Sequence, residues 1–114
     1  MQIRRPEALE RTWLSKDYGD GDGYEHCALG YLMVELTDVA PKELSYSEQG
    51  LGVPISYYLE SRIAVEDLLG VTRGDTNDLI KDNDNATESE MRVDRLGEWL
   101  QQHGHSYMEE ADAI

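Results

Sequence analysis

The longest apolar stretch of the chain runs from Cys27 to Ala40 and predicts a buried helix at the centre of the fold. Its apolar residues recur at helical spacing in two stripes: Ala28, Leu32, Leu36 and Val39 in one, and Cys27, Tyr31 and Val34 in the other. Together the stripes cover most of the helix circumference, which is typical of a helix packed on several sides. Pro41 is expected to end this helix because proline cannot donate the next backbone hydrogen bond. We therefore expect a central helix over residues 24–40.

Two further helices are predicted from proline position and apolar spacing. Pro6 suits a first helical position, and Leu9 and Trp13 then share one face of a helix from Pro6 to Lys16. Between Ile55 and Leu69 the apolar residues again recur in two adjoining stripes: Ile55, Leu59 and Ile63, and Tyr58, Val65 and Leu69. This spacing favours a helix over a strand, and Gly70 is expected to stop it.

Two threonines followed three residues later by an acid mark the starts of the last two helices. Thr72 and Asp75 precede a short helix that ends near Lys81, with Leu79 and Ile80 inward. Thr87 and Glu90 form a capping box before a helix from Glu88 to His103, whose inward residues are Val93, Leu96, Trp99 and Leu100. Gly104 is the expected stop, and Gly97 inside the helix predicts the close approach of another helix.

These elements predict an all-α fold, a compact bundle of about five helices around the buried helix at residues 24–40. No pair of alternating runs joined by a hairpin signal indicates a sheet. A length of 114 residues suits one core, so residues 1–104 are expected to form a single domain. Residues 105–114 are expected to form a frayed acidic tail.

Charge is the most unusual property of the chain. Ten Lys and Arg face 24 Asp and Glu, giving a formal net charge of −14. Such a chain should repel nucleic acid and anionic membranes, and its self-repulsion costs stability. A single cysteine excludes an internal disulfide, and no apolar run has the ~20 residues of a membrane span or the pattern of a signal peptide. We expect a cytoplasmic protein.

The acidic residues gather in two blocks, residues 17–40 and 75–90. Several lie at helical spacings that place carboxylates about 5–6 Å apart on one face. Such rows can imitate a phosphate backbone and attract the basic groove of a nucleic-acid-binding protein. The alternative is a solvated acidic face that binds nothing. The candidate partner-binding residues are Asp17, Asp20, Asp22, Asp75, Asp78, Asp82, Asp84, Glu88, Glu90 and Asp94.

Other chemistry finds little support in the sequence. The loop Asp20-Gly21-Asp22-Gly23 does not fit a calcium loop, because Tyr18 and Leu29 would occupy the first and twelfth ligand positions. Cys27 could be a reactive thiolate at a helix start, although a buried structural cysteine is the favoured interpretation. His103 and His105 have no evident further metal ligands. We therefore predict no catalytic residues, no metal and no cofactor.

Several short motifs resemble a group of small, largely uncharacterised phage and prophage proteins over roughly residues 24 to 103. The motifs are Cys27-Ala28-Leu29-Gly30, Leu69-Gly70-Val71-Thr72, Leu79-Ile80, the Asn83-Asp84 turn and Leu96-Gly97-Glu98-Trp99-Leu100. This resemblance implies a helical fold and transfers no catalytic residues. By class, a small acidic phage protein is similar to anti-CRISPR and other anti-defence inhibitors, several of which mimic nucleic acid.

Three functional hypotheses follow. The first is a non-enzymatic inhibitor of a host defence protein, CRISPR-Cas or restriction, that occupies a basic nucleic-acid site without touching nucleic acid itself. The second is a protein interaction module with incidental acidity, and an apolar patch around Tyr57 and Tyr58 is then its expected contact. The third is a small enzyme or metal protein that uses Cys27 and the histidines.

Overall fold

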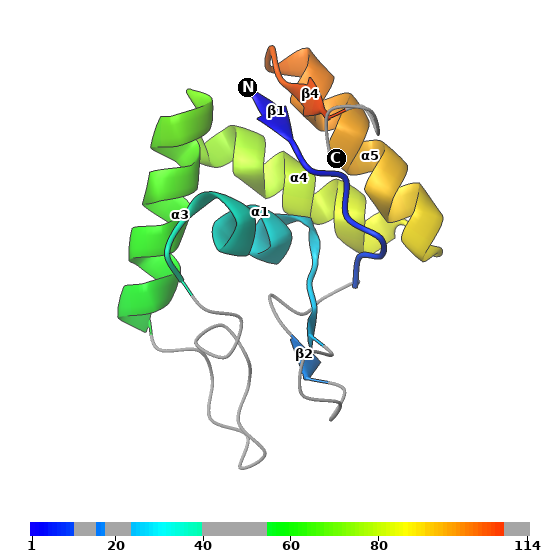
Figure 1. Ribbon diagram of the computed structural model, residues 1–114, viewed down its shortest axis with the longest axis horizontal. Coiled ribbons are helices and arrows are strands. Elements are labelled where there is room, and N and C mark those ends of the chain that lie inside the picture. Colours follow the sequence, from blue (N-terminus) through cyan, green and yellow to red (C-terminus); the bar gives the residue numbers. More distant parts are fainter. Residues whose placement is uncertain (11–15, 18–23, 40–54, 109–114) are drawn as a thin grey trace.

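The computed structural model describes residues 1–10, 16–17, 24–39 and 55–108. Within these ranges the chain is mainly helical, as predicted (Figure 1). The described helices are α1 (Ala28–Leu36), α3 (Ile55–Leu69), α4 (Arg73–Asn85) and α5 (Ser89–Gln102). The described strands have two residues each: β1 (Gln2–Ile3), β2 (Lys16–Asp17), β3 (Tyr24–Glu25) and β4 (Ser106–Tyr107). Of the five expected helices, the four that follow residue 24 are present.

Helix α1 lies at the centre of the described fold and contacts α3, α4 and α5. Its residues from Ala28 to Met33 are all buried, which confirms the predicted central helix. The helix is shorter than the expected 24–40, because residues 24–25 pair with β2 as strand β3. At its other end the Thr37 hydroxyl donates to the Met33 carbonyl at 2.5 Å, and the extended backbone of Thr37 ends the helix before Pro41 is reached.

The N-terminal segment is extended, and the helix predicted from Pro6 is wrong over the described residues 6–10. Tertiary hydrogen bonds replace the intrahelical ones: Ser89 Oγ accepts from the Leu9 amide at 3.0 Å, and Arg92 Nε donates to the Leu9 carbonyl at 2.7 Å. The Glu10 amide donates to the His26 carbonyl at 2.7 Å. Leu9 is buried by this anchoring, while Trp13 lies outside the described residues.

Strand β1 pairs in parallel with β4, so residues far apart in sequence lie side by side (Figure 1). Ile3 is opposite Tyr107, and the Met108 amide donates to the Ile3 carbonyl at 2.8 Å. The expectation of a frayed tail from His105 is therefore wrong for residues 105–108, which are held against the N-terminal segment. The acidic residues after Met108 lie outside the described residues.

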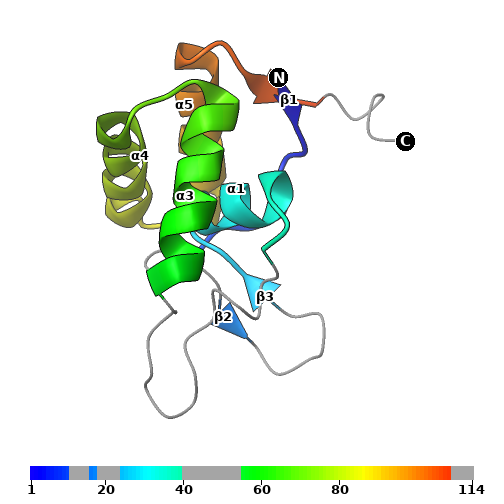
Figure 2. The same ribbon diagram turned by 90° about the vertical axis from the view of Figure 1, so that its left-hand side faces the viewer.

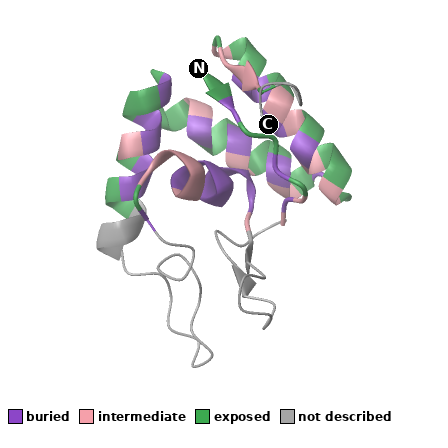
Figure 3. Cartoon of the chain, viewed as in Figure 1, coloured by how far each residue is buried: buried purple, intermediate pink, exposed green. Residues whose placement is uncertain are grey.

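Helix α3 has the predicted bounds, and its two predicted apolar stripes differ in burial. Leu59 and Ile63 of one stripe are 40% and 49% exposed. The buried residues include Val65 and Leu69, as predicted, and also the charged Arg62 and Glu66. Figure 3 accordingly shows exposed residues along α3 and a largely buried α1 beside it. The side chains of residues 55–58, including Tyr57 and Tyr58, lie outside the described ones.

A polar network accounts for the burial of Arg62 and Glu66. The Glu66 carboxylate accepts hydrogen bonds from Arg73 Nε at 2.7 Å and from the Thr76 hydroxyl at 2.7 Å. Arg62 reaches the same carboxylate at 3.4 Å and donates to Thr76 Oγ1 at 2.9 Å and Asn77 Oδ1 at 2.6 Å. Burial alone would raise the pKa of Glu66, but these hydrogen bonds and the two guanidinium charges outweigh burial and lower it. The network joins α3 to the start of α4.

The last two helices largely follow the prediction. Thr72 and Asp75 form a reciprocal capping box at the start of α4, which then continues past Lys81 to Asn85. The second box is absent, because Glu88 rather than Thr87 occupies the N-cap position of α5 and makes no side-chain capping bond. Gly70 and Gly104 have φ of 68° and 82°, values suited to glycine at helix ends. The inward residues of α5 are all buried, as predicted.

Gly97 permits a close approach, although its neighbour is an aromatic ring rather than a helix. A Cβ at this position would lie 2.8 Å from Cε2 of Tyr107. The Tyr107 hydroxyl donates to the Val93 carbonyl at 2.6 Å, and Arg5 lies 5.3 Å from the ring centroid. Gly97 thus lets β4 lie against α5 and closes the N-terminal segment onto the helical core.

Candidate protein-interaction site

Three of the predicted carboxylates lie along one face of α4. Asp75, Asp78 and Asp82 are spaced at i, i+3 and i+7, so their side chains follow one stripe of the helix. The stripe is about 10.5 Å long at 1.5 Å per residue. A single strand of B-DNA carries one phosphate per 3.4 Å of helix axis, so about four phosphates span the same length, and the three carboxylates form a sparser row of the same sign of charge. The structure brings these three residues together as the sequence predicted.

The N-terminal end of this stripe is held by the capping box. The Asp75 carboxylate accepts from the Thr72 amide at 2.9 Å, and Thr72 Oγ1 accepts from the Asp75 amide at 3.1 Å. These bonds to Thr72 lower the pKa of Asp75, with the nearby His103 as a smaller cause. Asp75 therefore keeps its negative charge while fixing the start of the helix.

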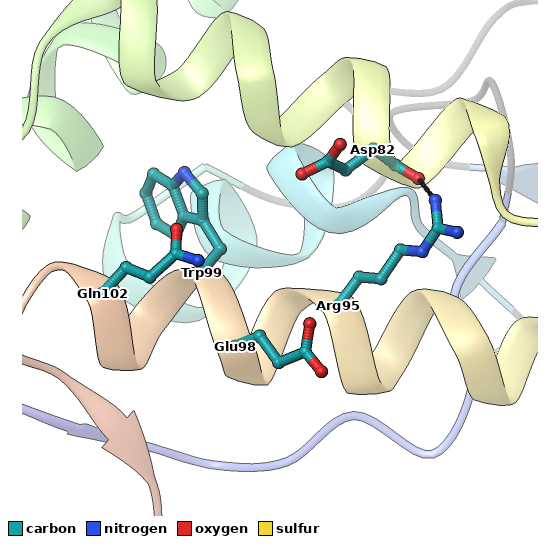
Figure 4. Close-up of a pocket in the computed structure, with 5 residues that line it drawn as sticks. All are labelled: Asp82, Arg95, Glu98, Trp99 and Gln102. Atoms are coloured by element: carbon teal, nitrogen blue, oxygen red, sulfur yellow. Dashed lines mark hydrogen bonds between the residues drawn. The ribbon is translucent and has the colours of Figure 1, made fainter.

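The stripe borders a half-open cleft of about 230 Å³ between α4 and α5 (Figure 4). The residues that line it are Asp82, Arg95, Glu98, Trp99 and Gln102. The four from α5 share one face, since they are spaced at i, i+3, i+4 and i+7. The cleft places the carboxylate of Glu98 across from α4, so that acids of two helices face one opening.

The arginine in this cleft bonds to the backbone and not to the acids. Arg95 Nη1 donates to the Asp82 carbonyl at 2.9 Å, and Figure 4 shows the Asp82 carboxylate pointing away from that guanidinium. No ion pair involves Asp78, Asp82 or Glu98 among the residues that the structure describes. Asp82 and Glu98, which line the cleft, and Asp78, one turn before Asp82 on α4, therefore have no ion-pair partner among the described residues.

Helix α4 is fixed to the core through polar contacts at both of its ends. Trp99 Nε1 donates to the Asp75 carbonyl at 3.0 Å, and the Trp99 ring lies 4.7 Å from that of His103. Near the other end, the buried Asn83 accepts from the Ala28 amide at 3.2 Å and donates to the Glu10 carbonyl at 2.8 Å. Asn83 thereby satisfies an orphan N–H at the start of α1. The acidic stripe is thus carried on a rigid support.

The other candidate residues do not extend this stripe. Asp94 pairs with Arg5 at 3.1 Å and is not among the residues that line the cleft. Glu88 and Glu90 are exposed at the start of α5, and Asp84 is partly buried near the end of α4. Asp17 belongs to β2, but its side chain lies outside the described part, as do Asp20, Asp22 and the loop considered for calcium.

Cys27 is a buried structural residue in this fold. It occupies the N-cap of α1, where its sulfur accepts from the Gly30 amide at 3.5 Å. Burial raises the pKa of its thiol to about 11, so the thiolate is strongly disfavoured near neutral pH. His105 bonds through Nε2 to the Leu69 carbonyl at 2.8 Å. In the described ranges, no group of three or more Cys, His, Asp or Glu side chains is arranged to hold a metal.

Glu98 and Arg95 were missed as site residues in the sequence. The sequence held a signal for Glu98, which lies four residues after Asp94 and one turn from Arg95. Only the packing of α5 on α4 shows which side of α5 borders Asp82. Gln102 carries no charge and gave no signal.

The chain matches no family model, no curated protein and no solved structure. None of the helices in the described ranges combines the length and apolarity that a bilayer crossing requires.

Proposed function

We propose that this protein is a non-enzymatic inhibitor that binds a basic nucleic-acid-binding surface of another protein through the α4 stripe and Glu98. The single observation that carries the proposal is a row of three carboxylates along one face of a capped helix, without ion-pair partners for Asp78 and Asp82 among the described residues. A basic groove supplies the missing cations, and the net charge of −14 accelerates the encounter. The resemblance to small phage proteins makes a host defence protein the natural target.

Surface acidity alone does not distinguish a binding site from a solvated face. Two features favour binding. The arginines near the stripe are directed at backbone carbonyls, Arg95 at Asp82 and Arg92 at Ala86 with 2.8 Å, so they hold the fold together without neutralising the acids. Ordered carboxylates also lose less conformational entropy on binding than carboxylates on a loose segment.

The test uses two double variants with the same net charge. Asp78→Lys with Asp82→Lys removes the middle and end of the stripe, whereas Glu7→Lys with Asp38→Lys reverses two exposed acids elsewhere. Immobilised parent, stripe variant and control variant are used to capture proteins from a bacterial lysate at low salt. We expect parent and control to capture the same nucleic-acid-binding protein, released by double-stranded DNA or by high salt, and the stripe variant to lose it.

Exposed charges contribute little to stability, typically within ~0.5 kcal/mol, so both variants should melt near the parent. A captured protein that binds all three forms equally and resists competing DNA would contradict the proposal, because nucleic-acid mimicry requires both the stripe and the competition.

A further inference from the structure

The cleft between α4 and α5, which Figure 2 shows packed side by side behind α3, is too small for a nucleotide or an organic cofactor. Its volume of about 230 Å³ lies below the ~300–1,000 Å³ of pockets that hold drug-sized ligands, yet it is several times the ~30 Å³ share of one water molecule. The cleft is half open, so a group can enter it from solvent. A space of this size suits the end of one long side chain.

The groups that line the cleft favour a cation. Asp82 contributes a carboxylate from α4 and Glu98 contributes one from α5, and both line the same opening (Figure 4). Neither has an ion-pair partner among the described residues. Two carboxylates that face one space repel each other, and a cation between them removes this repulsion. Gln102 adds an amide oxygen that can accept a further hydrogen bond.

The base that lines the cleft does not take this place. Arg95 donates through Nη1 to the Asp82 backbone carbonyl at 2.9 Å, and the Asp82 carboxylate points away from that guanidinium (Figure 4). Two carboxylates and one guanidinium leave the lining residues with one excess negative charge. The indole of Trp99 is 4% exposed, so the groups that an occupant meets are mainly polar.

A guanidinium fits these groups better than a metal ion or an ammonium. In the described ranges no three Cys, His, Asp or Glu side chains are arranged to hold a metal. An ammonium is a compact, strongly hydrated charge, whereas a guanidinium is planar, weakly hydrated and carries five N–H donors in a fixed fork. Acceptors that come from two helices match a donor set that points in several directions.

We propose that the cleft receives the side chain of one arginine from the protein that this chain binds. The guanidinium donates to the carboxylates of Asp82 and Glu98 and to the amide oxygen of Gln102. The assignment rests on the proposed function, which supplies the basic surface that carries the arginine. It adds specificity, because Asp75 and Asp78 attract any positive surface, whereas the cleft requires a guanidinium at one defined place on that surface.

The experiment follows the binding of small probes by two-dimensional proton–nitrogen NMR of the full chain, at an ionic strength of about 0.1 M. The probe is Nα-acetyl-arginine-methylamide, and the matched probe is Nα-acetyl-lysine-methylamide, which has the same charge. The indole N–H of Trp99 and the side-chain amide of Gln102 report on the cleft. The variant Trp13→Phe assigns the indole signal, since the chain has two tryptophans.

We expect the arginine probe to shift both signals in a saturable manner, and the lysine probe to bind at least about fivefold more weakly. Glu98→Gln should weaken the arginine probe about tenfold, because a hydrogen bond to a charged group is lost. The matched variant Glu90→Gln makes the same charge change at an exposed residue of the same helix and should alter the affinity less than about twofold. Free L-arginine should bind no more tightly than the blocked probe, because its own carboxylate meets an acidic surface.

Three outcomes would overturn the arginine assignment. They are equal affinities of the two probes, equal losses in Glu98→Gln and Glu90→Gln, and free L-arginine that binds far more tightly than the blocked probe, which would indicate a small metabolite as the ligand. The unchanged signals of residues outside the cleft check that each variant folds.

Asp78→Asn separates this assignment from the proposed function, because Asp78 lies on the stripe and does not line the cleft. It should weaken capture of the partner and leave the affinity for the arginine probe unchanged. Arginine binding without capture of a nucleic-acid-binding protein would contradict the proposed function alone. Capture of such a protein without arginine binding in the cleft would contradict the arginine assignment alone.

Discussion

Helices α3 and α5 have nearly the same length, 15 and 14 residues, yet they orient their apolar residues differently. In α5, Val93, Leu96 and Leu100 are buried and the charged residues face outward. In α3, Leu59 and Ile63 face outward while Arg62 and Glu66 are buried. The comparison teaches that periodicity defines the faces of a helix, whereas the neighbouring elements decide which face is buried.

The difference arises from what each helix packs against. The inner face of α5 meets apolar side chains of the core, which include Ile3, Leu9 and Leu29. Helix α3 packs on α1, and it also reaches the N-terminal turn of α4, where Arg73, Thr76 and Asn77 offer polar atoms. The Glu66 carboxylate accepts four hydrogen bonds there, and a buried polar group that is fully bonded is stable in a low-dielectric interior.

The strongest test of this comparison is removal of the charge of Glu66. The variant Glu66→Gln removes the carboxylate that Arg62 and Arg73 share, and breaking a buried pair costs about 3–5 kcal/mol. The double variant Arg62→Met with Glu66→Leu removes both charges and should recover most of the lost stability. Urea unfolding measures both. A loss under ~1 kcal/mol for Glu66→Gln would mean that the network does not hold α3 in its orientation.

The same variant gives a defined pH dependence. The folded-state pKa of Glu66 lies below its usual value of 4.5, so the folded state binds fewer protons than the unfolded chain. The stabilisation by the network is therefore complete above the usual value and is lost as pH falls through the lower folded pKa. The glutamine of Glu66→Gln does not titrate. The difference in the free energy of unfolding between parent and variant, measured by urea unfolding, should therefore become smaller at acidic pH.

A second test compares apolar truncations on the two helices. Leu96 is fully buried, and Leu96→Ala should cost about 2–5 kcal/mol. Ile63→Ala on the outer face of α3 should change the free energy of unfolding by no more than ~0.5 kcal/mol, because its side chain is half exposed. Equal losses of unfolding free energy for the two variants, measured by urea unfolding, would place Ile63 in the core and contradict its exposure on the outer face of α3.

The smallest expected effect tests the close contact between Gly97 of α5 and Tyr107 of β4. Gly97→Ala places a Cβ 2.8 Å from the Tyr107 ring, and overpacking of about 1–3 kcal/mol should outweigh a gain of ~1 kcal/mol in helix propensity. Gly74→Ala is the control, since the nearest neighbour of its Cβ would be Thr72 Oγ1 at 3.6 Å, an ordinary contact. We expect the melting temperature to fall for Gly97→Ala and to stay or rise for Gly74→Ala. A rise of equal size in both would show that Tyr107 adjusts freely.

Local signals in the sequence were sufficient for much of the helical part. Thr72 and Asp75 marked the start of α4, Gly70 and Gly104 marked helix ends, and the apolar spacing of α5 gave its buried face. Each of these signals depends on residues within one or two turns of each other, so the interactions that decide the structure lie within the segment itself.

Apart from the missing capping box at Thr87 and the extension of α4 to Asn85, the failures involve partners distant in sequence. The β1 and β4 strands are too short to show alternation, and the extended form of Leu9 is stabilised by Ser89 and Arg92. The face of α3 likewise depends on Thr76 and Asn77 of another helix. At the candidate site, the spacing of Asp75, Asp78 and Asp82 was readable, but the contribution of Glu98 and the separation of Asp94 required the packing of α5.

The parallel pairing of β1 with β4 also constrains the order of events during synthesis. The contact partners of Ile3 and Leu9 are translated about 80 to 100 residues later. At a translation rate of roughly 5–20 residues per second, the residues that cover these apolar side chains are synthesised on the order of 5–20 s later. During that interval α1, α3 and α4 can assemble around the Glu66 and Asn83 contacts, while a nascent chain that stalls before α5 keeps its N-terminal segment open to chaperones and proteases.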